Sequence, residues 1–153
     1  MAHDPKRELL RHLIATIVFR GRVAIIDAPS HFYDFKIAES IRTPVEILAH
    51  IGDLLEGSLI LLKGEFVYLN SESREWADEV SRFIAAAGAF DAYLTGDGPL
   101  RQPIEKITQG PIADALTHIG QIILLRRAAG FPVQSTSYFE AEIVPGEFDP
   151  RGS

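Results

Sequence analysis

The sequence contains no cysteine. Disulfides, thiolate nucleophiles and zinc sites built on cysteine are therefore excluded, and nothing in the composition indicates an oxidising compartment. The sequence also lacks an apolar run near the roughly 18–20 residues that a membrane-spanning helix needs. Its first residues, Met1 to Glu8, lack the apolar core and small-residue cleavage site of a secretion signal. We therefore expect a cytoplasmic protein with no membrane partner.

Basic residues are scarce. Lysine and arginine number 15 against 21 acidic residues, which gives a net charge of −6. Surfaces that bind duplex nucleic acid usually carry a basic excess, so we expect no nucleic-acid partner. No GxSxG nucleophile motif is present, and residues 96–98 (Gly-Asp-Gly) lack the lysine and helix context of a phosphate-binding loop. These absences remove the commonest hydrolase and nucleotide-binding signatures.

The patterns that are present indicate an all-α protein. Its 153 residues are 46% hydrophobic and 24% charged, as in an ordinary globular domain. Four segments show helical periodicity, and the connections at about 28–42 and 97–109 are longer than the link between the second and third segments. This layout predicts a four-helix bundle with two crossover connections. We expect a single domain over residues 1–153, in which residues 133–153 form an extended tail, or include a short strand, packed partly on the bundle.

The first two helices have clear start signals. Asp4 is a good N-cap and is followed by Pro5, so the first helix is expected to run from there to about residue 26. Thr43 and Glu46 have the spacing of a capping box, with proline between them at the first helical position. The second helix is therefore expected to run to about Lys63.

The last two helices are bounded by weaker signals. The third is expected to open near Ser71 or Ser73 and to end at Gly96, with its charged residues on the side opposite its apolar face. The fourth is expected to start at Gly110-Pro111 and to run to about Ala129, before the breakers Gly130 and Pro132.

The histidines suggest a metal site. His118 and Asp114 lie four residues apart on a mostly apolar helix, about 6 Å along one face, which is a spacing at which two side chains reach one cation. If the second and fourth helices pack side by side, His50 supplies a third ligand. The residues thus predict a divalent-metal site of His50, Asp114 and His118 with open positions for water or substrate. A purely structural interpretation stays open: the pair on the fourth helix would face solvent and His50 would be a boundary histidine.

Three further residues are candidates for a supporting role. Thr117 and Gln121 continue the polar stripe of the fourth helix and are predicted to support the ligands. Arg126 lies about two turns beyond His118, where its guanidinium could meet a substrate carboxylate. The histidines at positions 3, 12 and 31 are predicted to lie at the terminus, on the rim and in a loop.

Two segments resemble a known family. Residues 44–51 (PVEILAHI) are similar to the second helix of DinB/YfiT-like proteins, in which a histidine follows a short apolar lead-in. Residues 117–122 (THIGQI), followed by LLRRAAGFP at 124–132, are similar to that family's last helix. The resemblance implies a four-helix bundle that holds a divalent metal through one histidine of the second helix and an HxxxH pair of the last. Carried over by position, these ligands match His50, position 114 and His118.

The chain departs from the family's pattern at one ligand, since it has Asp114 where the family has histidine. Aspartate is a competent ligand for zinc, nickel, iron or manganese. The resemblance implies a transferase that uses a low-molecular-weight thiol, which must come from a cosubstrate because the chain has no cysteine. The departure favours an alternative, a non-catalytic ligand-binding or interaction bundle that has lost the metal. A metal-dependent hydrolase is a third hypothesis. We expect no organic cofactor, a small-molecule substrate and a homodimer.

Overall fold

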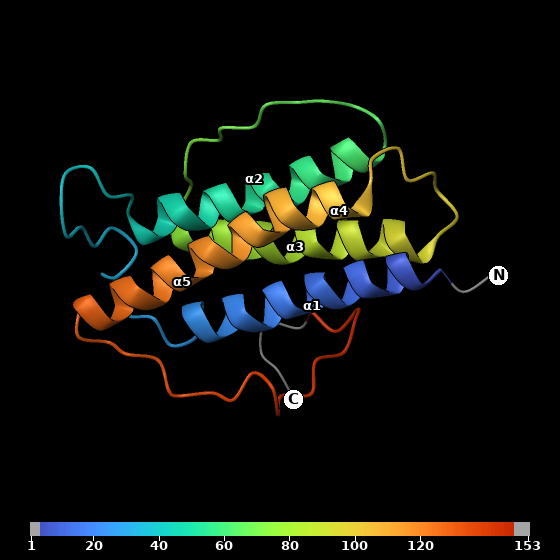
Figure 1. Ribbon diagram of the computed structural model, residues 1–153. Coiled ribbons are helices and arrows are strands. Elements are labelled where there is room, and N and C mark those ends of the chain that lie inside the picture. Colours follow the sequence, from blue (N-terminus) through green and yellow to red (C-terminus); the bar gives the residue numbers. More distant parts are fainter. Residues whose placement is uncertain (1–3, 149–153) are drawn as a thin grey trace.

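A computed structural model describes residues 4–148 of the chain. Its long helices are α1 (Pro5–Ile25), α2 (Pro44–Leu62), α3 (Trp76–Thr95) and α5 (Ala113–Ala128), and the short α4 (Ile104–Ile107) enters α5 through a π-helical turn, η1 (Thr108–Ile112) (Figure 1). The predicted all-α, four-helix architecture is confirmed. Among residues 4–148, no helix has both the length and the apolarity needed to cross a bilayer. His3 and residues 149–153, for which the sequence also made predictions, lie outside the described residues.

Each long helix packs against two others. α1 and α2 both contact α3 and α5, so α1 and α2 lie diagonally across the bundle. Figure 1 shows that α1 and α5 run in one direction and α2 and α3 in the other. α2 and α5 are therefore antiparallel neighbours, which is the adjacency that the predicted metal site requires.

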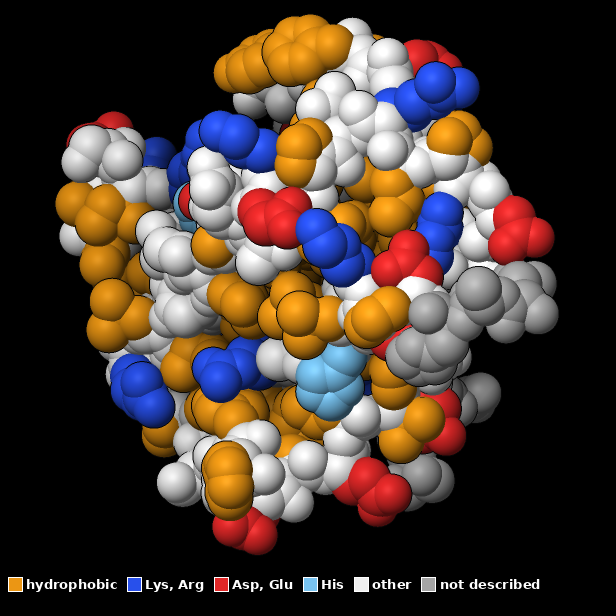
Figure 2. All heavy atoms as spheres, turned by 45° about the vertical axis from the view of Figure 1, so that its right-hand side comes forward, with side chains coloured by type: hydrophobic (Ala, Val, Ile, Leu, Met, Phe, Trp, Pro, Cys, Tyr) orange, Lys and Arg blue, Asp and Glu red, His pale blue; other side chains and the backbone are white. Residues whose placement is uncertain are grey.

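The link between α2 and α3 has to return along the whole bundle, because these neighbours are parallel (Figure 1). Residues 63–75, which we call the strap, make this return without helix or strand. α2 has 19 residues and is about 28 Å long, a span that the strap covers easily at about 3.3 Å per residue. The strap carries two side chains that are 81% exposed, Phe66 and Tyr68. In Figure 2, large hydrophobic side chains project from the top edge of the molecule, the side along which the strap runs in Figure 1.

Two predictions about the connections are wrong. The third helix begins at Trp76 rather than at Ser71 or Ser73, so the link that we expected to be short is long. The physical reason is that Ser71 is held in the strap by Asp53 of α2, which accepts hydrogen bonds from the Ser71 backbone N–H and hydroxyl at 2.8 and 2.7 Å. The connection expected at 97–109 is shorter than predicted, because helical structure resumes at Ile104.

The start of the last helix was also predicted wrongly. Helical structure begins at Ile104 and continues through Pro111, which lies inside the π-helical turn. Ile104, Ile107 and Ile112 are buried, and this burial favours extending the helix toward its N-terminus. Pro111 has no N–H to donate, so the regular hydrogen-bond ladder cannot pass through it, and the backbone widens there. The π-helical turn ends at Ile112, two residues before Asp114.

The first two helices form as their sequences predict. The Asp4 carboxylate accepts from the backbone N–H of Lys6 at 3.0 Å. The Thr43 hydroxyl accepts from the backbone N–H of Glu46 at 3.4 Å, and the Glu46 carboxylate accepts from that of Thr43 at 2.7 Å, which completes the capping box. Both caps satisfy backbone donors that a helix start leaves free.

The tail after α5 is extended and contains no strand up to residue 148. It packs on α1 through Tyr138, whose ring lies edge-on to Phe19 with 6.3 Å between centroids and beneath the Arg20 guanidinium at 3.8 Å. Phe139 points away and is 94% exposed. Of the two alternatives left open by the sequence, the extended tail is therefore the one that forms.

Gly21 of α1 is required by the close packing of α1 on α3. A Cβ at position 21 would lie 2.5 Å from Cζ of the buried Phe83 ring. We expect Gly21→Ala to destabilise the protein by about 1–3 kcal/mol, because the overpacked core must shift. Gly120→Ala is the matched control, since nothing lies within 4 Å of a Cβ there, and it should stabilise by about 0.5–1 kcal/mol. Urea denaturation measures both, and equal effects would contradict the packing argument.

Candidate metal centre

Three side chains from two helices converge on one point between α2 and α5. His50 Nε2 lies 3.6 Å from Asp114 Oδ2, and His118 Nε2 lies 3.4 Å from Asp114 Oδ1. The rings of His50 and His118 meet edge to face, with 4.6 Å between centroids. The side chains are 25%, 48% and 13% exposed for His50, Asp114 and His118, so the group lies at the rim of the bundle and is open on the aspartate side.

The spacing of these atoms fits a shared metal ion. One ligand atom from each of the three residues lies within 4.8 Å of the other two. Two ligands bound tetrahedrally to one zinc ion at about 2.0–2.1 Å lie about 3.4 Å apart, which matches the separations between aspartate and imidazole. Two imidazoles and a carboxylate are also a ligand set that zinc and other divalent transition metals accept. His50, Asp114 and His118 therefore form a group that could hold a metal ion.

Gln121 contacts the far side of the His118 ring. The Oε1 atom of Gln121 lies 2.8 Å from His118 Nδ1, and because an amide oxygen accepts, the contact is a hydrogen bond when Nδ1 carries the proton. In the neutral ring, Nε2 then presents its lone pair to Asp114. This is the arrangement that orients a metal-bound histidine from its far side. The supporting role of Gln121 stays a prediction, and its side chain lies where that role requires it.

His50 favours the neutral form. Burial lowers the pKa of its imidazole, His118 and Arg42 lower it further, and Asp114 opposes them without reversing the shift. A neutral imidazole has a free lone pair, so His50 is available as a ligand at neutral pH. A neutral His50 imidazole beside the Asp114 carboxylate offers a nitrogen lone pair next to a negative charge, an arrangement that suits a cation.

Comparison with known proteins gives no significant match: no protein family, no curated protein and no solved structure corresponds to this chain. The likeness to DinB/YfiT-like proteins therefore stays a resemblance in two helices. What the structure adds is independent of that likeness, because the convergence of the three side chains follows from the packing of α2 on α5.

Other candidate residues have structural partners. The Thr117 hydroxyl donates to the carbonyl of Ala113 in its own helix at 3.0 Å. The buried Arg126 donates to the carbonyls of Ala24 and Ile26 at 3.1 and 2.6 Å, and to that of Phe131. It thereby satisfies backbone acceptors at the end of α1. His12 and His31 are exposed, His31 against the ring of Phe131.

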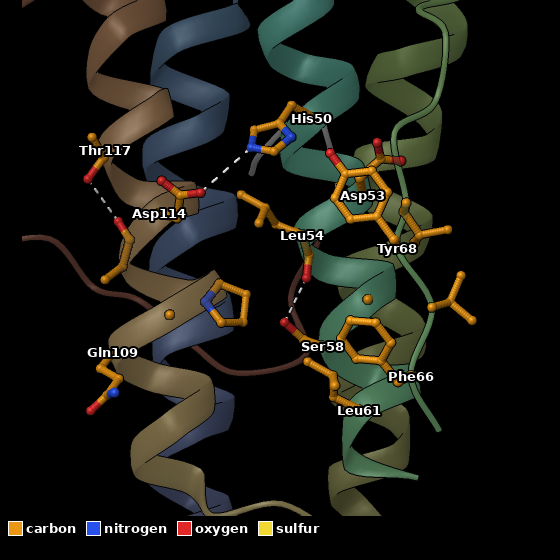
Figure 3. Close-up of a pocket in the computed structure, with 16 residues that line it drawn as sticks. His50, Asp53, Leu54, Ser58, Leu61, Phe66, Tyr68, Gln109, Asp114 and Thr117 are labelled. Carbon is orange, nitrogen blue, oxygen red and sulfur yellow. Dashed lines mark hydrogen bonds and ion pairs between the residues drawn. The ribbon is translucent and has the colours of Figure 1, made fainter. Parts of the chain in front are cut away.

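A pocket of about 590 Å³ adjoins the triad, in the size range of small-molecule sites. His50 and Asp114 lie at one end of it, and Leu61 and Gln109 lie toward the other (Figure 3). Its walls come from α2, from the π-helical turn with the start of α5, and from strap residues 66–69. No local sequence pattern predicts this pocket, because the strap reaches it only through contacts between segments far apart in the chain.

Sequence reasoning missed the ion-pair network that holds the strap beside the pocket. The guanidinium of Arg82 on α3 lies among Asp53, Glu56 and Glu79, with Nη2 within hydrogen-bond distance of Asp53 and 2.9 Å from Glu56 Oε2. Glu79 is almost completely buried and accepts from the backbone N–H of Arg74 at 2.9 Å. The charged residues of the third helix were predicted to lie opposite its apolar face, and the side chains of two of them, Arg82 and Glu79, are nevertheless only 8% and 0% exposed.

The ionisation of Asp53 makes the free energy of unfolding depend on pH in the acid range. Burial would raise the pKa of its carboxyl, but hydrogen bonds from Arg82 and Ser71 outweigh burial and hold it below the ordinary 3.8. This stabilisation is present above pH 3.8 and is lost as pH falls through the lower pKa of the folded state. We expect Asp53→Asn to be less stable than the wild type at pH 7, with a difference that narrows toward pH 2. Denaturant unfolding across this range tests it, and a constant difference would contradict it.

Proposed function

We propose that this chain is a divalent-metal-binding protein whose ligands are His50, Asp114 and His118, and that the ion serves chemistry on a small molecule in the adjoining pocket. The observation that supports the proposal most directly is the approach of two imidazole Nε2 atoms to one carboxylate, at 3.4 and 3.6 Å, from separate helices. The resemblance to DinB/YfiT-like proteins supports the same three positions.

Each residue has a distinct task in this proposal. His118, oriented by Gln121, and His50, kept neutral by its surroundings, donate nitrogen lone pairs. Asp114 supplies the negative charge and leaves the exposed side of the group open to a substrate. A divalent ion with open positions lowers the pKa of a coordinated thiol or water. The resemblance points to thiol transfer, and the thiol would come from the cosubstrate.

Titration with Co²⁺ tests the metal site directly. Protein stripped with a chelator should take up one Co²⁺ per chain and show visible absorption bands, because nitrogen and oxygen ligands impose a distorted, low-symmetry coordination. His50→Ala and His118→Ala should lose the bands. His12→Ala is the matched control, since His12 is an exposed histidine on α1, and it should keep them.

Two results would contradict the proposal. Equal metal content in the wild type and in His50→Ala would mean that any bound ion lies elsewhere. Absence of Co²⁺ uptake by the wild type would favour the alternative of a bundle that binds small molecules without a metal.

A further inference from the structure

The pocket beside the triad has an unusual balance of side chains for a metal-centred site. Among the 16 residues that line it there is no lysine or arginine. The two lining aspartates are Asp114, in the triad, and Asp53, whose carboxylate is occupied by Arg82 and Ser71. A substrate with phosphate or several carboxylate groups would find no cation here apart from an ion held by the triad.

Two hydroxyl groups of the pocket are also occupied. The hydroxyl of Ser58 donates to the carbonyl of Leu54 at 2.6 Å, and that of Thr117 donates to its own helix. Their hydrogens are therefore already used within the helices. The rest of the lining is mainly apolar and comes from all three walls: Leu54, Leu61, Phe66, Val67, Leu69, Pro111 and Ala113. Such a surface favours an apolar ligand body.

The strap offers apolar area that the folded chain leaves uncovered. Phe66 and Tyr68 line the pocket although each is 81% exposed. The strap is anchored near its other end, where Ser71 is bound by Asp53 and the backbone of Arg74 by Glu79. Two exposed aromatic rings are thus held along the pocket, where a bound ligand would remove their apolar surface from water.

We propose that the pocket binds an apolar small molecule that carries one metal-coordinating group, such as a thiolate, carboxylate or hydroxamate. The coordinating group lies at the end formed by His50 and Asp114, and the apolar body lies between Leu54 and Leu61 of α2 and the strap rings of Phe66 and Tyr68 (Figure 3). This assignment rests on the proposed metal-binding function and adds the substrate class.

A pair of probes with one head group tests the assignment. Acetohydroxamic and octanohydroxamic acid chelate a metal identically and differ only in their apolar chain. On Co²⁺-loaded protein, calorimetry should show octanohydroxamate binding at least tenfold more tightly, which corresponds to about two buried methylene groups. Tighter binding should come with a negative heat-capacity change.

Strap variants locate the apolar contact. The double variant Phe66→Ser/Tyr68→Ser should reduce the ratio of the two affinities to less than threefold, while the Co²⁺ spectrum and the acetohydroxamate affinity stay unchanged. Both side chains are exposed, so the fold should tolerate the change. Phe139→Ser is the matched control: this ring is 94% exposed in the tail, does not line the pocket, and should leave the ratio intact.

The outcomes separate this inference from the metal site. Normal Co²⁺ uptake with equal affinities for the two hydroxamates would overturn the apolar ligand class and leave the metal centre standing. A tenfold preference that survives the double strap variant would overturn the strap as the binding surface. Failure to take up Co²⁺ would overturn both proposals.

Discussion

Arg82→Leu is expected to destabilise the protein by about 3–5 kcal/mol, since it leaves buried carboxylates without their partner. Asp53 and Glu79 are 5% and 1% exposed, and the guanidinium contacts both of them. Arg82 Nε also donates to Glu56 Oε1 at 3.0 Å, and Nη1 donates to the carbonyl of Ala49 at 3.1 Å. Leucine provides similar bulk and none of these donors. Urea denaturation at pH 7 measures the loss.

Two further variants distinguish the effect of breaking the ion-pair network from the effect of removing any arginine. Arg127→Leu removes an exposed arginine of α5 and should change stability by less than about 0.5 kcal/mol. Adding Asp53→Asn and Glu79→Gln to Arg82→Leu should recover part of the loss, because the neutral amides leave no buried charge without a partner and keep acceptor oxygens for the Ser71 and Arg74 backbone N–H groups. A loss below about 1 kcal/mol for Arg82→Leu would show that water reaches the carboxylates freely.

The elements that could be predicted from the sequence are those whose cause is local. The N-cap of α1 and the capping box of α2 depend on residues within a single helical turn, and both formed as expected. The apolar face of α1 depends on helical periodicity alone, and Leu10, Ile14 and Ile17 on that face are buried. Such signals need no knowledge of the rest of the chain.

The strap could not be predicted, because its cause is not local. Ser71 and Ser73 are good helix-start residues, and nothing nearby in the sequence prevents a helix there. The α3 start is delayed because Asp53 binds the backbone of Ser71, a contact that needs the strap packed on α2, while Glu79 in the first turn of α3 binds the backbone of Arg74. The path of the helix through Pro111 likewise reflects buried isoleucines before it, which outweigh a local breaker.

The candidate site was predictable in part for the same reason. Asp114 and His118 share a face by their four-residue spacing, which is local. Their meeting with His50 depended on the condition that α2 and α5 are neighbours, and the structure fulfils it. The pocket and the apolar surface of the strap were not predicted, since they exist only because α2 and α3 run parallel (Figure 1).

Zinc is expected to stabilise the folded protein strongly if the triad binds it. At a free concentration one hundred times the dissociation constant, binding contributes about 2.7 kcal/mol, and for a chain of this length that raises Tm by about 5–10 °C. His118→Ala should abolish the rise, because it removes the ligand that is 13% exposed and oriented by Gln121. His12→Ala should keep it. Differential scanning calorimetry with and without Zn²⁺ measures these shifts.

Variants of Asp114 decide whether its carboxylate is a ligand or only a neighbour of the two histidines. Asp114→Leu should lose the Zn²⁺-dependent rise in Tm, because two imidazoles alone hold the ion weakly. Asp114→His should retain it, since an imidazole nitrogen in place of the carboxylate completes a set of three histidine ligands, which zinc also accepts. If Asp114→Leu kept the full rise, the ion would be bound without the carboxylate, and the three-ligand site would be wrong.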